Sequence, residues 1–530
     1  MEITESQPID DISPIEGATN ALPKPDNYIP SRRQVIKNAF FNTISIGAPA
    51  LTALVMTPFL ISALGKSTYG LWLLIAAVLS WFTLVDIGVR TAACRYFSLH
   101  RAEDDAAAIN STFTTSIIIL SIGSLLIAIA TVIGTMVMPL MIEVPPDQIV
   151  ELRMAMLIAG LGLALTYPQR ILEALLFGWQ WFGILSSLEI FTLLVQTGFV
   201  VLLVLQGHGL VGIAVACFIS GVFSAGIKWA SIRKLMPQVQ FVWSQTSYQK
   251  TQELFLFGGW NILRHMSKTA LSSVALFIVG IAISTASVTV YGVAGKLVEY
   301  ITLAMVAIFG VLVPISTTLH AQQDQGREEK FFLSGSRYCW LLSIYLVGGL
   351  LLFAQPFIRL WLGNEMLDAY RIVAILAVGS IVPLSQIMTD NVLVAKSRHQ
   401  LLAILMLVTA VVALVASWFV VDQFGLTGIA TIVASAATIA AIFECRMGCS
   451  ILGVAKITYT MKAIVPVLLI SAVPLGFTAF VRNWWTPASW PYLILGVAGY
   501  TGLFLLAYSF SMIKSLRVSD CAMRPSHGPS

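Results

Sequence analysis

Charged side chains inside long apolar segments are the residues of this chain whose types and spacing could do chemistry. Asn261, Arg264 and Lys268 follow one another at intervals of three and four positions, so on a helix they share one face, with His265 beside it. No acidic residue lies between positions 254 and 282, and these cations therefore need a partner from another segment. Cations gathered at a cavity would bind an anion such as a pyrophosphate through charge-assisted hydrogen bonds.

A second group lies in the next apolar segment, where Lys296 and Glu299 are three residues apart on one face, with Tyr300 beside them. At a rise of about 1.5 Å per residue, Arg264 lies about 16 Å and Lys268 about 22 Å along their helix. Two hypotheses stay open. In the first, Glu299 pairs with Arg264 or Lys268 and holds the second half together. In the second, a surplus of positive charge lines a water-filled cavity near mid-membrane, and both hypotheses can hold at once.

Asp86 and Arg90 stand four residues apart near the end of an earlier apolar run, a spacing that lets them pair on one helix face. The alternative is a gate element, or an approach site for a charged headgroup, at the cytoplasmic end. Arg170, Glu173 and Asp390 occupy similar positions near the ends of their segments, which predicts interfacial pairing or capping.

Glu189 lies about 10 Å into its own apolar segment and has no obvious partner nearby in the sequence. Ionisable residues inside membrane spans are costly and mark cavities, partners or ion pathways. We therefore interpret Glu189, together with Glu299, as a charge partner or a coupling residue.

The elements that must position these residues are membrane helices. The 530 residues are 57% hydrophobic and only 11% charged, whereas soluble domains carry about 25% charged residues. The chain cannot cover a water-facing surface, and we expect an all-α integral membrane protein. The net charge of +5 is modest and gives no indication of a nucleic-acid partner.

Apolar segments long enough to span a bilayer, roughly 20 residues each, recur from about residue 38 to 512 and predict about fourteen transmembrane helices. Their approximate cores are 38–64, 70–96, 112–140, 152–177, 182–206, 209–230, 254–282, 287–318, 337–358, 370–395, 400–421, 425–445, 463–481 and 490–512. Lys and Arg gather at one set of helix ends, which places both termini in the cytoplasm by the positive-inside rule.

The two halves of the chain resemble each other, with Tyr69–Gly70 aligned to Tyr291–Gly292 and a polar turn at a similar distance after each. Six helices per half give both repeats the same orientation, and sites of parallel repeats lie at their interface near mid-bilayer. We expect an N-terminal lobe at 31–235 and a C-terminal lobe at 253–447, joined by a cytoplasmic linker at 236–252. Two further helices at 448–515 follow, and cytoplasmic tails lie at 1–30 and 516–530.

Motifs for metal, cofactor or covalent chemistry are missing from the sequence. The six cysteines show no zinc-ligand spacing. The stretch "LISALGKST" resembles part of a phosphate-binding loop but has Leu60 where the leading glycine should stand. There is no HExxH sequence and no Ser/His/Asp arrangement, and we expect a protein that is not an enzyme and binds neither a metal nor a cofactor.

Three stretches resemble a known family. "LGKSTYGLWLLIAAVLSWFTLVDIGVRTAACRYF", "VTVYGVAGKL…VPISTTLHAQQDQG" and "PFIRLWLGNE" are similar to patterns of polysaccharide transporters. These are the Wzx-type O-antigen and repeat-unit flippases of the MOP superfamily, which also holds the MATE exporters and the lipid II flippases. "DIGVR" departs from the usual "DLGL" of the family, with Arg90 in a less typical place.

The resemblance implies a multi-pass flippase of the bacterial inner membrane that moves undecaprenyl-diphosphate-linked oligosaccharide by alternating access between two six-helix lobes. It implies membrane lipids, a polysaccharide polymerase and glycosyltransferases as partners, and a monomer is expected. A MATE-like exporter of organic cations should hold buried acids in excess of bases, whereas bases predominate in the segments 254–282 and 287–318. A membrane glycosyltransferase or ligase should have large loops, and a scaffold without transport gives no reason for deep charges.

Overall fold

The computed structural model describes residues 32–246, 248–312, 316, 319, 325–396, 399–485 and 487–522, and the regular structure in this part of the chain is helical. The first half contains α1 (Arg32–Ala102), α2 (Ala106–Met141), η1 (Pro146–Gln148), α3 (Ile149–Thr166), η2 (Tyr167–Gln169), α4 (Arg170–Gly178), α5 (Phe182–Leu205) and α6 (Gly209–Leu235). The second contains η3 (Trp243–Gln245), α7 (Tyr248–Thr269), η4 (Ala270–Val274), α8 (Ala275–Ala282), α9 (Thr285–Phe309), η5 (Gly310–Leu312), α11 (Gln325–Leu362), η6 (Asn364–Met366), α12 (Ala369–Ser385), α13 (Ile387–Ala395) and α14 (His399–Ile451). The chain then continues through α15 (Lys456–Tyr459), η7 (Thr460–Ile464), α16 (Val465–Trp484) and α17 (Trp490–Ala522).

Twelve helices of the described residues are long and apolar enough to cross a membrane. Two of them, α1 with 71 residues and α14 with 53, are each interrupted by a glycine with non-helical backbone angles. Gly65 has φ 79° and Gly425 has φ 53°, values that favour glycine because it has no Cβ. The expected count of fourteen treats the limbs of α1 and α14 as separate spans and stays a prediction.

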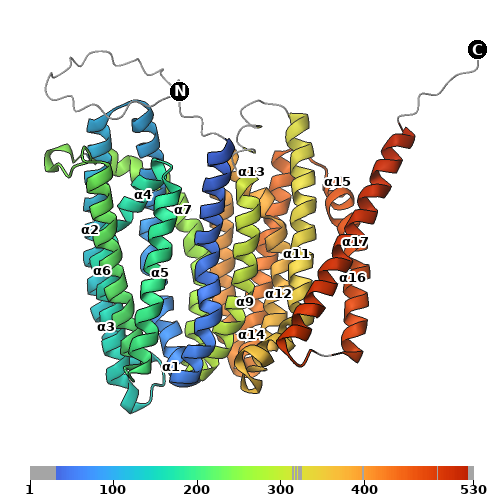
Figure 1. Ribbon diagram of the computed structural model, residues 1–530, viewed down its shortest axis with the longest axis horizontal. Helices are drawn as coiled ribbons and strands as arrows, with labels where there is room; N and C mark the ends of the chain where they lie inside the picture. The colour runs from blue at the N-terminus through green and yellow to red at the C-terminus, as the bar shows by residue number, and fades with distance from the viewer. Residues whose placement is uncertain are drawn as a thin grey trace, which may run out of the picture.

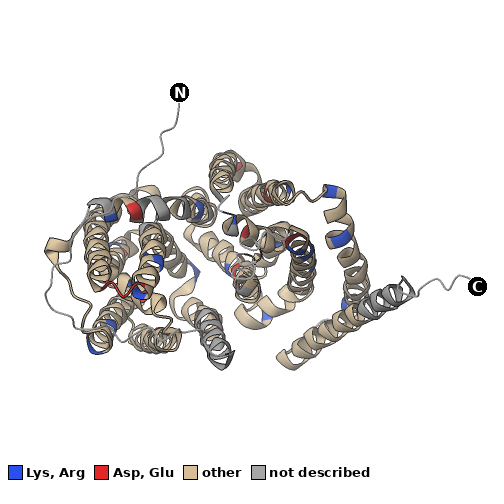
Figure 2. Cartoon of the chain, turned by 90° about the horizontal axis from the view of Figure 1, so that it is seen from above, with Lys and Arg blue, Asp and Glu red and all other residues tan. Residues whose placement is uncertain are grey.

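The helices run between two ends of one bundle. We call the end at which α1 begins and α17 ends the proximal end, and the opposite end, where α1 turns back, the distal end (Figure 1). Seen from above, the helices gather in two groups, and α16 and α17 extend to one side (Figure 2).

Four apolar cores hold the described part of the bundle together, and the smallest of them joins α1 to α5 and α6. Of the other three, one combines both halves near the distal end and includes Leu71, Leu152 and Leu210 with Val288 and Ile429. The second is built almost entirely from α1 to α6, and the third from the second half with α16 and α17. Burial of apolar side chains therefore joins the two groups at the distal end, while each group has a core of its own elsewhere.

Two predicted boundaries differ from the structure. The tail expected at 516–530 begins inside α17, which stays helical to Ala522 because its final turns contain no proline or glycine. The linker expected at 236–252 already includes the start of α7 at Tyr248. The N-terminal tail 1–30 lies outside the described residues, and the lobe boundaries stay predictions.

Candidate functional site

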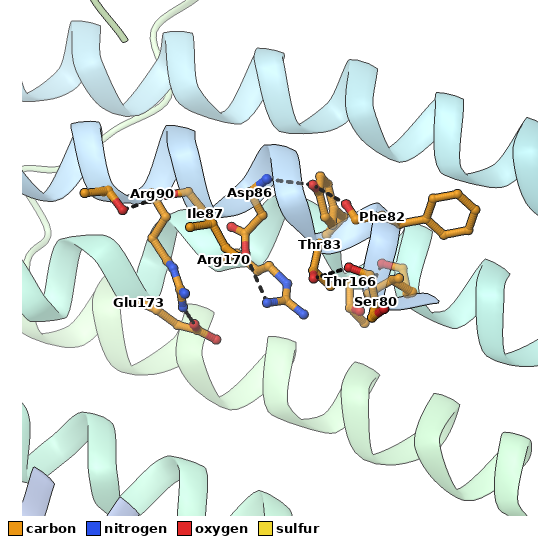
Figure 3. Close-up of polar contacts among 12 residues, drawn as sticks. Ser80, Phe82, Thr83, Asp86, Ile87, Arg90, Thr166, Arg170 and Glu173 are labelled. Atoms are coloured by element: carbon orange, nitrogen blue, oxygen red, sulfur yellow. Dashed lines mark hydrogen bonds and ion pairs between the residues drawn. The ribbon is translucent and has the colours of Figure 1, made fainter. Parts of the chain in front are cut away.

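A cluster of opposite charges lies inside the first half, where α1 faces α4 (Figure 3). The Asp86 side chain is fully buried, and its Oδ2 accepts a hydrogen bond of 3.0 Å from Nη1 of Arg170. The Tyr167 hydroxyl accepts from the backbone N–H of Asp86 at 2.9 Å and donates to the carbonyl of Phe82 at 2.8 Å. Asp86 Oδ1 has no hydrogen-bond partner among the described residues.

Arg90 and Glu173 form a second pair at 3.0 Å, one turn further along α1 and α4. The other carboxylate oxygen of Glu173 accepts from Lys228 of α6 at 2.6 Å, and the Lys228 side chain is buried. The pairing of Asp86 with Arg90 along one helix is therefore wrong as an interpretation, because each residue finds an opposite charge on α4 instead. We call Asp86, Arg90, Arg170, Glu173 and Lys228 the N-lobe charge cluster.

Glu189 of α5 lies beside this cluster. It lines a cavity of about 390 Å³ together with Lys228, Gln196 and residues of α1. Among the described residues, no ion pair or hydrogen bond of its carboxylate is found. Its position leaves a cavity at this side of the cluster.

A larger cavity of about 690 Å³ lies between α1, η4, α9, α12, α13 and α14, and we call it the central cavity. At its distal side it is lined by Leu73 and Gly292, and towards the proximal end by Gly310, Asn391 and Glu444. Its size falls within the range of small-molecule sites, roughly 300–1,000 Å³.

The deep charges of the second half meet at this cavity. Lys296 donates to Glu299 at 2.7 Å, and half of each side chain is exposed. Arg264 of α7 donates to both carboxylate oxygens of Asp390 in α13, at 2.8 and 2.9 Å. The hypothesis that Glu299 pairs with Arg264 is therefore wrong, because Asp390, 126 residues from Arg264 in sequence, takes that place.

The described lining of the central cavity combines one amine, Lys296, with the carboxylates of Glu299, Asp390 and Glu444. A cationic surplus is not found among these residues. The side chains of Asn261 and Lys268 lie outside the described residues, and the predicted cationic cavity stays a prediction that depends on Lys268.

Sequence reasoning missed three buried charged residues. Lys228 lies more than one turn inside α6 from the basic pair at its end, and its distance from that end was a signal for a buried role. Glu328 is buried and pairs with Lys396 at 3.0 Å, across α11 and the end of α13. Glu444 is buried in α14 and lines the central cavity.

Comparison with known sequences gives one family and two relatives. A family model described as "Polysaccharide biosynthesis protein" matches residues 61–371, more than half of the chain. "Uncharacterized membrane protein EpsK" of Bacillus subtilis is 22% identical over 58% of this chain and 61% of its own length, and so is matched over less than two thirds of it. "Putative O-antigen transporter" of Shigella flexneri is 20% identical over 75% of this chain and 93% of its own length.

Solved structures of MOP superfamily transporters share the fold. One described as the inward-facing conformation of a multidrug resistance MATE family transporter superposes with a TM-score of 0.65 at 15% identity, covering 78% of this chain and 98% of that one. A MOP superfamily transporter from Pyrococcus furiosus, described as having a binding pocket of reverse polarity, gives a TM-score of 0.60 at 15% identity over 79% of this chain and 96% of that one.

Proposed function

Because the chain belongs to the polysaccharide biosynthesis protein family, whose model matches residues 61–371, we propose that it is a flippase for lipid-diphosphate-linked oligosaccharide. Family and fold make it a multi-pass membrane transporter and not an enzyme. In the proposal it lies in the bacterial inner membrane with both termini in the cytoplasm. It receives its substrate from glycosyltransferases and delivers it to a polymerase by alternating access of its two lobes.

The observation that carries the proposal is the central cavity with its half-exposed pair of Lys296 and Glu299. Charged side chains in the membrane part of a protein face cavities or charged partners. Lys296 and Glu299 face the central cavity and also pair with each other. The amine of Lys296 supplies donors to a diphosphate, and the carboxylates supply acceptors to sugar hydroxyls. Arg264 is not part of this lining but forms a bidentate ion pair with Asp390, which is.

Coupling to an ion gradient is the second part of the proposal. Glu189 lines a cavity beside the N-lobe charge cluster, where an entering ion would meet its carboxylate. Glu299 has the corresponding position in the central cavity. Binding of a proton or a cation at either carboxylate would change the electrostatic energy of the neighbouring ion pairs.

Flipping by the purified protein tests the proposal. The protein is reconstituted in vesicles with a fluorescent lipid-diphosphate oligosaccharide, and the fraction accessible to an external glycosidase is followed over time. We expect Arg264→Ala with Lys268→Ala to abolish flipping, because Asp390 in the cavity lining loses its cationic partner and the phosphate loses the amine of Lys268. Arg264→Lys keeps the charge and should retain part of the rate.

The matched control is Arg233→Ala with Lys234→Ala, which removes two exposed cations at the end of α6, outside both cavities. It should flip at the parent rate. Parent rates in the Arg264 and Lys268 double variant would contradict the role of these cations. Absence of flipping in the parent protein, with its fold intact, would contradict the proposed function itself.

A second candidate function is export of small organic cations. The observation that favours it is the fold, which the chain shares with a structure described as a multidrug resistance MATE family transporter at a TM-score of 0.65. Vesicle uptake of a fluorescent organic cation distinguishes the two functions, since a flippase for an anionic lipid should not move it.

A further inference from the structure

Gly70 of α1 lies at a close approach between the two halves. A Cβ atom at this position would lie 1.9 Å from the backbone oxygen of Thr285 and 2.9 Å from its carbonyl carbon. Real Cβ atoms do not come so close to a backbone, so any side chain at Gly70 would force α1 and α9 apart. The backbone of α9 can therefore rest against α1 only because position 70 is a glycine.

Two hydrogen bonds close the same contact. The hydroxyls of Ser67 and Thr285 lie 2.7 Å apart, and the hydroxyl of Thr289 donates to the carbonyl of Lys66 at 2.6 Å. Thr285, Thr289 and Gly70 are buried. These bonds join residues more than 200 positions apart, one from each half of the chain.

Residues of α11 and η6 make further contacts with α1 next to these two hydrogen bonds. The Lys66 amine binds the backbone oxygen of Glu365 at 3.0 Å and its carboxylate at 3.1 Å. Trp361 donates its indole N–H to the carbonyl of Leu54 at 2.6 Å. The Glu365 carboxylate of this ion pair is 83% exposed, so the pair contributes little. The indole hydrogen bond connects the second half to the first limb of α1.

The contact lies directly against the central cavity. Leu73 and Gly292, one turn from Gly70 and Thr289 respectively, line the distal side of that cavity. The lining continues in the other direction to Gly310, Asn391 and Glu444 near the proximal end. The apolar core that combines both halves also lies on the distal side. The cavity extends from there along α1 and η4, where the hydroxyls of Ser80 and Ser273 join the halves again at 3.0 Å.

We propose that Ser67, Gly70, Thr285 and Thr289 form a distal gate, closed in this structure, that must part before the central cavity can reach the distal face. Gly70 decides how tightly the gate closes. Its counterpart in the second half, Gly292, has a different role, since a Cβ there would meet the end of the Leu73 side chain at 2.5 Å, and a flexible side chain can move aside. The proposal goes beyond the proposed function and holds for any substrate.

Accessibility of the cavity from each face tests the gate without any transport measurement. The full chain, with its native cysteines replaced by alanine, carries Ser380→Cys in the cavity lining and is reconstituted in vesicles. A membrane-impermeant maleimide is applied to one face at a time. With Gly70 in place, we expect labelling from the proximal face and little from the distal face.

Gly70→Val should raise the rate of distal labelling by about tenfold or more, because the closed state becomes less populated. Gly292→Ala, the repeat-related change, should alter it by about twofold at most. Gly198→Val is a further control, since a Cβ at this helical glycine of α5 meets nothing within 4 Å.

The double variant Ser67→Ala with Thr289→Val removes both hydrogen bonds without adding bulk. If Gly70→Val does not fold, the distal labelling of this double variant alone tests the gate. The double variant should also raise distal labelling. Equal distal labelling in the parent and in the gate variants would overturn the proposal, as would an equal rise in Gly70→Val and Gly198→Val.

Discussion

The Asp86 carboxylate is fully buried, and its only charged hydrogen-bond partner among the described residues is the Arg170 guanidinium at 3.0 Å. Replacing Arg170 by Ala leaves a buried charge uncompensated. We expect Arg170→Ala to lower the free energy of unfolding by about 3–5 kcal/mol, the cost of breaking a buried pair from one side. Thermal unfolding of the purified protein in detergent measures the change.

Arg90 gives the matched control for this prediction. Its side chain is 38% exposed, and its partner Glu173 keeps Lys228 when Arg90 is removed. Arg90→Ala should therefore cost clearly less, about 1 kcal/mol. Asp86→Asn combined with Arg170→Gln removes both charges and should recover most of the loss. Equal losses in the two single arginine variants would mean that Asp86 does not depend on Arg170.

At this scale the sequence identified charged residues that are paired in the structure, but not their partners. Asp86, Arg264 and Asp390 stand out because each interrupts or ends an apolar run. Their pairing joins residues 84 and 126 positions apart, across helices whose packing no local pattern records. Only a contact within one turn, such as that of Lys296 with Glu299, can be read from spacing.

Arg482 of α16 fastens the C-terminal pair of helices to the second half. It donates to the carbonyl of Leu351 at 3.2 Å and to the side-chain oxygen of Gln355 at 2.7 Å, both in α11. Hydrogen bonds from a charged group contribute about 1.5–3 kcal/mol, and we expect Arg482→Ala to loosen α16 and α17 by that amount. Amide hydrogen exchange measures the loosening, which should appear in α16 and α17 and leave α5 unchanged.

Arg371→Ala is the control for this element, since Arg371 lies at the same end of the bundle but is exposed and makes no ion pair among the described residues. It should leave exchange in α16 and α17 unchanged. Faster exchange across every helix of the Arg482 variant would indicate a general loss of stability rather than release of this element.

Elements were the most predictable level of this structure, because a spanning helix needs a long apolar run and little else. The reversal inside α1 lies at Gly65, between the predicted spans 38–64 and 70–96, and the reversal inside α14 lies at Gly425, the first residue of the predicted span 425–445. Interruptions within a span were not predicted in detail. Pro168 lies in η2, which separates α3 from α4, and Pro383 comes just before the break between α12 and α13. Proline removes a backbone donor, but the sequence does not say whether the helix bends or ends there.

For the whole molecule, the internal repeat predicted two similar halves, and the structure shows two groups of helices (Figure 2). The sequence could not predict how the two groups of helices are arranged relative to each other. This arrangement depends on which pair of helix faces is in contact, and an alternating-access transporter has at least two such arrangements of one sequence. The alignment of Tyr69–Gly70 with Tyr291–Gly292 identified the two helices that form the distal contact, but not the contact itself.

Locking this contact covalently should stop the whole molecule from working. The hydroxyl oxygens of Ser67 and Thr285 are 2.7 Å apart, so Ser67→Cys with Thr285→Cys can form a disulfide with little movement of the backbone. In a background without native cysteines, we expect oxidation to reduce flipping to the background rate and reduction to restore it. The physical reason is that the halves then cannot part at the distal end.

The same chemistry placed within one helix separates this effect from oxidation as such. Ser284 and Ser287 have hydroxyls 2.9 Å apart, both at the start of α9, so a disulfide between Ser284→Cys and Ser287→Cys joins nothing across the halves. The oxidised control should flip at its reduced rate. If the oxidised Ser67 and Thr285 variant also flips at its reduced rate, with the disulfide verified by mass, substrate crosses without parting this contact. The route would then run along the outside of the bundle rather than through the central cavity.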